Sequence, residues 1–289
     1  MTLPILFGAN VDPIWQPVDG PVRQARAAEE LGLDPITIQD HPYQSRFYDA
    51  WTLLTYLAAQ TERVTLVPTV ATLPLRPPAV LAKSAASLDL LTGGRVQLGL
   101  GAGAFWDAIV AMGGPRRGPR DAVDALDEAI QVIRAMWSGD RSVKVAGRHY
   151  TLAGTHPGPR PSAGLGVWLG AYGPRMLALT GAKADGWMPS HAYLGLDRLT
   201  EAVDRINDAA AAAGRDPARL RKIYNISGLI GRESDQPFQG SVRQWTDQLT
   251  SAATQHGMNG FVFWPAADHE HQLARFADEV VPAVRTALG

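Results

Sequence analysis

The sequence predicts an α/β protein with a (β/α)8 barrel, the TIM-barrel architecture, formed by residues 1–289 as a single domain. Short apolar runs alternate strictly with longer amphipathic runs, and there are eight of each. The short runs lack the polar alternation of half-exposed strands, as expected when both faces of a sheet are covered. Parallel strands need a crossover, which a helix usually supplies. An open doubly wound sheet is the alternative fold.

The eight predicted strands are apolar runs bounded by turn-forming residues. They are Ile5–Ala9, Pro35–Gln39, Val64–Val70, Arg95–Leu100, Val167–Ala171, Gly186–Pro189, Ile223–Leu229 and Gly260–Trp264. Each precedes an amphipathic run, so each strand and the helix after it form one unit of the predicted barrel.

The eight predicted helices carry recognisable start and stop signals. They are Val18–Leu31, Asp49–Gln60, Pro78–Leu91, Pro119–Trp137, Pro174–Ala184, Leu196–Ala213, Ser241–His256 and Glu270–Leu288. Proline begins three of them, at a position where its missing N–H costs no hydrogen bond. Gly32 and Gly257 stand where helices are expected to end.

Two of the segments that connect predicted strands and helices are longer than a barrel of this kind requires. An extra loop with its own apolar patch is predicted at residues 105–118, after the fourth strand. A hairpin insertion is predicted after the fourth helix, in the stretch VKVAGRHYTL. Long loops in compact domains are often lids or binding loops.

Composition excludes several classes of function. The chain is 46% hydrophobic and 19% charged, with a formal net charge of -1, so no nucleic acid partner is predicted. It has no cysteine, which rules out disulfides and thiolate metal ligands. No signal peptide and no apolar run of about 18 residues are evident, so we predict a cytoplasmic protein with no membrane span. His269 and His271 lack further ligands nearby, and no metal site is predicted.

The active site of such a barrel lies at the carboxyl ends of its strands. The candidate residues at these ends are Asn10, Asp40, His41, Thr69, Val70, Gly101, Gly103, Gly170 to Gly173, His191 and Trp264. Several are small, two are imidazoles, one is an indole, and few are charged. This set favours a large flat ligand over a metal or a highly charged sugar phosphate.

The sequence resembles the bacterial-luciferase-like flavin-dependent oxidoreductases through nearly its whole length. The resemblance is carried by the segment LAKSAASLDLLTGGRVQLGLGAG, the pair Asp40-His41, the turn GAYGPR with ADGWMPS after it, and GFVFWP. Within that superfamily it is closest to the branch that uses the deazaflavin F420, and FMN is the alternative cofactor. The resemblance also implies a homodimer and a small-molecule substrate.

The resemblance implies roles for individual residues. Thr69-Val70 matches a non-prolyl cis peptide in a bulge behind the central ring of the cofactor. Asp40 and His41 match positions beside that ring, although Asp40 could equally cap its segment or pair with an arginine. Gly103 matches a position on the other flank of the ring, and the small residues from Gly101 to Gly103 would let the ring lie against the backbone. Sugar dehydrogenases of the superfamily carry a Trp shortly after the His and a Glu after the strand-four glycines. Ser45 or a neighbour and Ala104 stand there instead, which argues against sugar phosphate oxidation.

The turn before Pro174 suits an anion. The first N–H groups of a helix are unpaired and attract negative charge. The cofactor phosphate is therefore expected at Gly170, Ala171, Tyr172, Gly173, Pro174 and Arg175, where the superfamily also binds it. An ordinary tight turn explains the glycines equally well. The arginine-rich segment 116–120 suits the anionic tail of F420, or is simply a solvated basic turn.

His41 is the predicted catalytic residue, as a proton donor or hydrogen-bond partner beside the ring. A solvent-facing turn histidine before Pro42 is the alternative. Asn10, His191 and Trp264 are substrate-side candidates; the alternatives are a turn residue for Asn10, an exposed histidine for His191 and a packing residue for Trp264. The predicted activity is hydride transfer between deazaflavin and a small organic substrate. An FMN-dependent monooxygenase or reductase, or a non-catalytic flavin or deazaflavin binder, are the alternatives.

Overall fold

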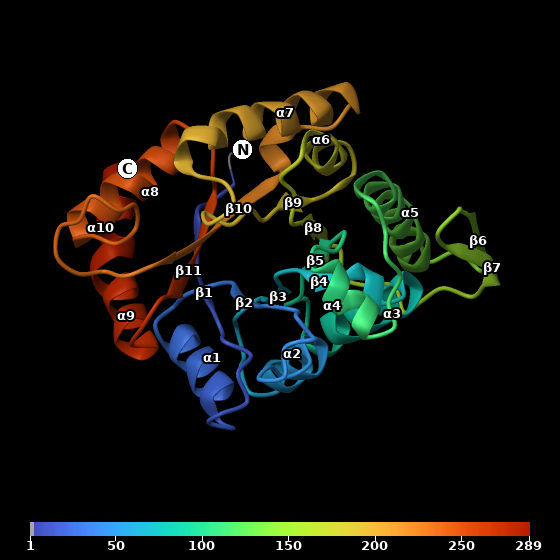
Figure 1. Cartoon of the computed structure of the whole chain (residues 1–289), viewed down its shortest axis with the longest axis horizontal. Helices are drawn as coiled ribbons and strands as arrows, with labels where there is room; N and C mark the ends of the chain where they lie inside the picture. Colours follow the sequence, from blue (N-terminus) through green and yellow to red (C-terminus); the bar gives the residue numbers. More distant parts are fainter. Residues whose placement is uncertain (1–2) are drawn as a thin grey trace.

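The main sheet is a nearly closed barrel of parallel strands surrounded by helices, in a computed structural model that describes residues 3–289 (Figure 1). Within these residues nine strands hydrogen-bond in the order β3-β2-β1-β11-β10-β9-β8-β5-β4. They are β1 Leu6–Asn10, β2 Ile36–Ile38, β3 Leu66–Pro68, β4 Ala71–Thr72, β5 Leu98–Gly101, β8 Val167–Leu169, β9 Gly186–Trp187, β10 Arg221–Gly228 and β11 Gly260–Pro265. The predicted TIM-barrel class is confirmed.

The third predicted strand, Val64–Val70, is not continuous. Within it only β3, Leu66–Pro68, is a strand, and the second short strand β4 begins at Ala71, just after the predicted end. The peptide bond Thr69–Val70 between them is cis, as the resemblance predicted. β3 pairs with β2, whereas β4 pairs with β5. β3 and β4 therefore lie at the two ends of the hydrogen-bonded strand order, and together they close the barrel. Because these two short strands share the third strand position, nine strands occupy eight positions of the barrel.

Helices cover the outside of the barrel. Their bounds are α1 Gly20–Glu30, α2 Ala50–Ala58, α3 Pro78–Leu91, α4 Trp106–Ala111, α5 Pro119–Trp137, α6 Pro174–Lys183, α7 Leu199–Ala212, α8 Val242–Thr254, α9 His269–Arg275 and α10 Val281–Leu288. The last predicted helix is interrupted by a π-helical segment, Phe276–Val280, between α9 and α10. Side-chain caps fix two starts: Asp49 accepts from the N–H of Thr52 at α2, and Ser241 caps α8.

Both predicted insertions are present, and one of them differs in structure from the prediction. Residues 105–118 were predicted to be a loop, but they contain the short helix α4, which buries Ile109 against the barrel. The hairpin is confirmed as the antiparallel pair β6 Val143–Ala146 and β7 Thr151–Thr155, which projects beyond α5 (Figure 1).

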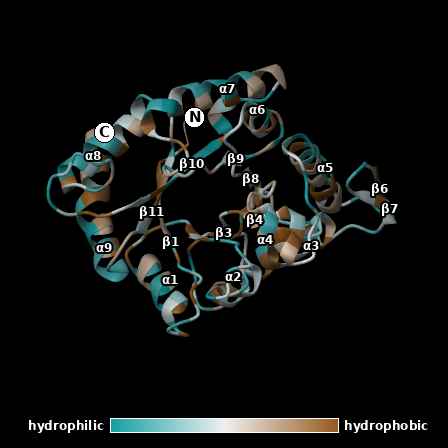
Figure 2. Ribbon diagram, viewed as in Figure 1, coloured by the Kyte–Doolittle hydropathy of each residue, from teal (hydrophilic) through white to brown (hydrophobic). Residues whose placement is uncertain are grey.

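The inside of the barrel is filled by side chains. Val67, Trp168, Met188, Ile223 and Val262 form a buried apolar cluster there. Val70 and Trp264 pack against it and close its upper side. Hydrophobic residues line strands β1 and β11, whereas the outer helices present hydrophilic faces (Figure 2). The packed interior therefore supplies a rigid floor at the carboxyl ends of the strands. Among residues 3–289, no helix combines the length and apolarity needed to cross a membrane.

Candidate active site

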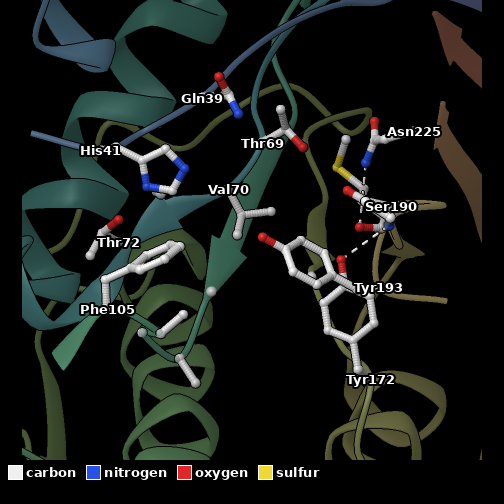
Figure 3. Close-up of a pocket in the computed structure, with 18 of the residues that line it drawn as sticks. Gln39, His41, Thr69, Val70, Thr72, Phe105, Tyr172, Ser190, Tyr193 and Asn225 are labelled. Atoms are coloured by element: carbon white, nitrogen blue, oxygen red, sulfur yellow. Dashed lines mark hydrogen bonds between the residues drawn. The ribbon is translucent and has the colours of Figure 1, made fainter. Parts of the chain in front are cut away.

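A cavity of about 710 Å³ opens at the carboxyl ends of the barrel strands. This is the position that the barrel prediction gave to the active site. Figure 3 shows Val70 near its centre, with His41, Thr72 and Phe105 on one side and Tyr172, Ser190, Tyr193 and Asn225 on the other. The lining also includes Gln39, Thr69, Gly101, Gly103, Gly170, Gly173 and Trp264.

His41 faces this cavity from the turn after β2. Its Nδ1 lies 2.7 Å from the hydroxyl oxygen of Tyr43, which leaves Nε2 for the cavity. The Phe105 ring packs edge-on against the imidazole, with 5.4 Å between ring centroids. Burial lowers the pKa of His41 and outweighs the opposing attraction of Asp40. The ring is therefore neutral at pH 7, and it can accept or donate a proton at Nε2.

Asp40 turns away from the cavity, although it adjoins His41 in sequence. Its side chain is only 1% exposed, and each carboxylate oxygen accepts a hydrogen bond of 2.7 Å from Arg76. One oxygen also accepts from the backbone N–H of Thr72 at 2.8 Å. Burial alone would lower the pKa of Arg76, but hydrogen bonds and attraction from Asp40 and Asp49 raise it above its usual value. Asp40 thus anchors the wall that carries His41.

Thr69 and Val70 line the cavity, and two predicted glycines pack around the Val70 side chain. A Cβ at Gly101 would lie 2.6 Å from Cγ2 of Val70, and a Cβ at Gly170 would lie 3.1 Å from the same atom. Their lack of a side chain makes room for the Val70 bulge. Gly103 instead has φ +102°, and a Cβ there would meet Pro74 and Trp106. All three glycines therefore have a steric role within the chain itself.

The turn before α6 separates this cavity from a second one of about 840 Å³. Gly173 belongs to both linings, whereas Pro174 and Arg175 line the second. Ala171 is buried, and its carbonyl accepts from the indole N–H of Trp187 at 2.9 Å. The Tyr172 hydroxyl accepts from the backbone N–H of Ser190 at 3.0 Å.

The second cavity has a polar mouth. The first intrahelical hydrogen bond of α6 runs from the N–H of Leu177 to the carbonyl of Gly173, so the earlier N–H groups of the helix have no intrahelical acceptor. The start of α5, with Arg120, lies on the opposite side. Arg175 also lines this cavity, and its guanidinium pairs with Asp124 at 2.7 Å.

The three arginines of the segment 116–120 make different contacts. Arg116 pairs with Asp107, and the guanidinium of Arg117 lies 5.3 Å from the centre of the Tyr150 ring. Arg120 lines the second cavity. One of the three arginines is thus placed at the cleft that adjoins the active-site cavity.

The three substrate-side candidates occupy different environments. Trp264 lines the main cavity. Asn10 is 2% exposed and donates to Asp12 at 3.1 Å, so its amide is engaged beneath the cavity wall. His191 packs edge-on against Phe238, with 4.9 Å between ring centroids, and burial lowers its pKa. Asn10 and His191 are outside the lining that contains Trp264.

Several lining residues were not identified from the sequence. Tyr43, Phe105 and Tyr193 add aromatic surface to the lining. Ser190 and Asn225, which the strand pattern does place just after the sixth predicted strand and within the seventh, supply polar atoms on the opposite wall (Figure 3). Tyr43 and Tyr193 each follow a strand-end histidine by two residues, which is the one sequence signal that could have indicated them. Phe105 could not be placed, because a loop gives no orientation for its side chains.

Comparison with known proteins assigns the chain to a family. The family model described as luciferase-like monooxygenase matches residues 5–288, and the protein belongs to this family. Among curated relatives, the F420-dependent glucose-6-phosphate dehydrogenase of Rhodococcus erythropolis is 31% identical over 257 residues, covering 85% of this chain and 74% of the relative. The corresponding enzyme of Nocardia farcinica is 29% identical over 251 residues, covering 83% of this chain and 73% of the relative.

Solved structures agree on the fold. An F420-dependent secondary alcohol dehydrogenase in complex with an F420-acetone adduct matches with a TM-score of 0.86 at 20% identity, covering 98% of this chain and all of that chain. The coenzyme F420-dependent tetrahydromethanopterin reductase of Methanopyrus kandleri matches with a TM-score of 0.81 at 20% identity, covering 97% of this chain and 99% of that chain. At these identities the likeness shows the shared barrel.

Proposed function

We propose that the protein is an F420-dependent oxidoreductase that transfers hydride between the deazaflavin and a small organic substrate. The observation that carries the proposal is the main cavity, in which a histidine with one free ring nitrogen faces the bulge at Thr69–Val70. Relatives near 30% identity are named F420-dependent enzymes, which favours the deazaflavin over FMN. When bound, F420 supplies a hydride acceptor or donor at C5 of its ring.

Two residues that line the cavity each carry a buried polar atom for which a flat heterocycle could supply a partner. Asn225 is 2% exposed, and its side-chain oxygen has no hydrogen-bond partner among the described residues. The indole N–H of Trp264 is likewise unpartnered there. Buried polar groups normally find partners. The pyrimidinedione edge of a deazaflavin or flavin offers both N–H donors and carbonyl acceptors, so it complements this pair.

His41 would manage the proton that accompanies hydride transfer. If the Nδ1–H of His41 donates to the Tyr43 oxygen, Nε2 has a free lone pair and can take the proton of a substrate hydroxyl as its carbon loses hydride and becomes a carbonyl. If Tyr43 donates to Nδ1, Nε2 carries the hydrogen and can donate to a carbonyl oxygen. Both directions therefore use the same nitrogen.

The second cavity would hold the phosphate of the cofactor. The unpaired N–H groups at the start of α6, the backbone of Gly173 and the side chain of Arg120 converge there. Helix N-termini favour anions, and guanidinium groups bind phosphate oxygens strongly. The anionic tail of F420 would continue past Arg120.

Cofactor titrations test this function. We expect the purified protein to bind F420, with a perturbed absorption band at roughly 420 nm, and to bind FMN, which absorbs at about 450 nm, more weakly. Tight binding of FMN without F420 binding would favour the FMN-dependent monooxygenase or reductase instead. F420 binding without turnover of any alcohol or carbonyl compound would favour a non-catalytic binder.

The proposal extends to a homodimer in the cytoplasm. Exposed apolar side chains lie on α2 and α3, including Tyr56, Val80 and Leu91, and a partner chain could cover them. Sedimentation equilibrium measures the assembly. A monomer at micromolar concentration would contradict the dimer and leave the cofactor assignment intact.

A further inference from the structure

The main cavity has a neutral lining. Among the described residues that form it, none is an Asp, Glu, Lys or Arg. Its polar groups are the amides of Gln39 and Asn225, the hydroxyls of threonine, serine and tyrosine, and the imidazole of His41. Because the pKa of His41 is lowered by burial, this ring adds no charge at pH 7.

The charges nearest to the cavity are already compensated. The carboxylate of Asp40 lies behind the wall and is bound by Arg76. Arg76 also pairs with Asp49 at 2.5 Å, so two carboxylates compensate its charge, and it is not part of the cavity lining. Arg120 and Arg175 line the second cavity, at the end that the proposed function gives to the cofactor phosphate.

A phosphorylated substrate does not fit this distribution. A phosphate dianion in a partly buried site needs cations or several N–H donors, because removing it from water without them is costly. In the main cavity the described side chains offer neutral hydroxyls and amides in place of cations. The dianion of a sugar phosphate would therefore bind poorly beside His41. In this respect the chain differs from the relatives named F420-dependent glucose-6-phosphate dehydrogenase.

The opening of the cavity is aromatic instead. Phe105 is 50% exposed and Tyr193 is 65% exposed, and they lie on opposite sides of Val70 in Figure 3. Phe105 packs against His41 and Tyr43, whereas Tyr193 packs against Tyr172 with 5.5 Å between centroids. Burial raises the pKa of Tyr43 to about 12, and Asp40 and Tyr193 add to this increase, so this phenol is uncharged at pH 7.

We propose that the substrate is an uncharged molecule with a flat apolar body, which lies between Phe105 and Tyr193 and presents one hydroxyl or carbonyl to His41. This proposal rests on the proposed function for the identity of the cofactor. Large exposed aromatic side chains gain most when a planar apolar ligand covers them, because ring stacking adds to the burial of apolar area. The neutral lining then selects against charged alternatives of similar size.

The test separates the substrate class from the cofactor assignment. F420 binding is measured first, by titration. Acetophenone, 1-phenylethanol and glucose 6-phosphate are then titrated into the F420-loaded protein and into the protein alone, and binding is measured by calorimetry. We expect the two aromatic compounds to bind at least about tenfold more tightly than glucose 6-phosphate. Tighter binding of glucose 6-phosphate would overturn the inference even where F420 binds well.

Variants locate the binding surface. Phe105→Ala and Tyr193→Ala should each weaken acetophenone binding by about tenfold and leave F420 binding within about twofold. Val18→Ala is the control, because Val18 is also an exposed apolar residue and lies outside the linings of both cavities, and it should leave both affinities unchanged. Unchanged acetophenone binding in both cavity variants would refute the proposed position. If F420 fails to bind, the proposed function fails, and the titrations of the protein alone still decide whether the cavity prefers neutral aromatic compounds.

Discussion

Gly173 gives the sharpest test of the proposed phosphate site, because a side chain can be added there without disturbing the fold. Its φ of -79° and ψ of 157° lie in a region that any residue adopts. A Cβ at Gly173 would meet no atom of the described chain within 4 Å. Gly173→Val therefore places its methyl groups in open space, at the start of α6 where both cavities meet.

The expected loss can be estimated from the donors at the start of α6. The N–H groups of Arg175 and Met176 precede the first intrahelical hydrogen bond, so two donors are free to bind an anion. A hydrogen bond to a charged group contributes about 1.5–3 kcal/mol. Blocking both costs about 3–6 kcal/mol, and affinity falls by at least about 100-fold, since each tenfold change is worth about 1.4 kcal/mol.

Stability should change little in the same variant. Valine is a poorer helix N-cap than glycine, which accounts for a loss of about 1 kcal/mol or less. Gly231→Val is the matched control, because a Cβ at Gly231 also meets no described atom within 4 Å and the loop is remote from both cavities. The control should bind cofactor as the wild type does.

The assay compares phosphorylated and dephosphorylated forms of the same cofactor by fluorescence titration. The wild type should bind the dephosphorylated form much more weakly, and Gly173→Val should bind both forms weakly. Thermal unfolding of each variant checks the fold. Equal affinity of the wild type for both forms, or unchanged binding in Gly173→Val, would leave the turn as loop structure without a role in anion binding.

Four further predictions concern His41 and the residues packed around it. His41→Ala should lower turnover by about 100-fold or more with little change in melting temperature, and a large stability loss with normal kinetics would contradict its role. Tyr43→Phe should lower kcat and shift its pH profile while F420 affinity stays constant; an unchanged profile would remove Tyr43 from the proton path. Asp40→Asn should lower the free energy of unfolding by about 3 kcal/mol, measured by urea denaturation, because it leaves Arg76 without its buried partner. Because the folded-state pKa of His41 is lowered, stability should fall from about pH 7.5 to about pH 5.5 as the unfolded state takes up the proton, and it should fall less in His41→Gln.

The barrel could be predicted from the sequence because its signals are local and repeated. Each apolar run and each amphipathic run has its own periodicity, and α3 and α5 begin and end where their proline starts and apolar spacing predict. The division of the third strand at Thr69–Val70 has no such signal in composition, and the resemblance alone indicated it. The helix α4 was missed because six residues give too short a pattern to distinguish from a loop.

The site was harder to predict, because the direction of a side chain at a strand end depends on its neighbours in space. Asp40 and His41 adjoin in sequence, yet the imidazole faces the cavity and the carboxylate faces Arg76, 36 positions further along the chain. Pairing of Asp40 with an arginine was one of the alternatives for this residue, but that partner lies in another loop, and a single sequence does not identify which arginine it is. Gly101 was predicted to let the cofactor ring approach the backbone, whereas the atom it accommodates in the structure is a methyl group of Val70 within the same chain.

The pair behind the wall also explains why the cavity in front of it is neutral. A carboxylate directly beside His41 would normally hold the imidazole protonated. Here Arg76 binds both oxygens of Asp40 at 2.7 Å, and the burial of His41 outweighs the attraction of the carboxylate, so the pKa of the imidazole is lowered. The imidazole is then neutral at pH 7, as required for a group that must both take and give a proton. The neutral cavity therefore depends on a charged pair that lies outside it.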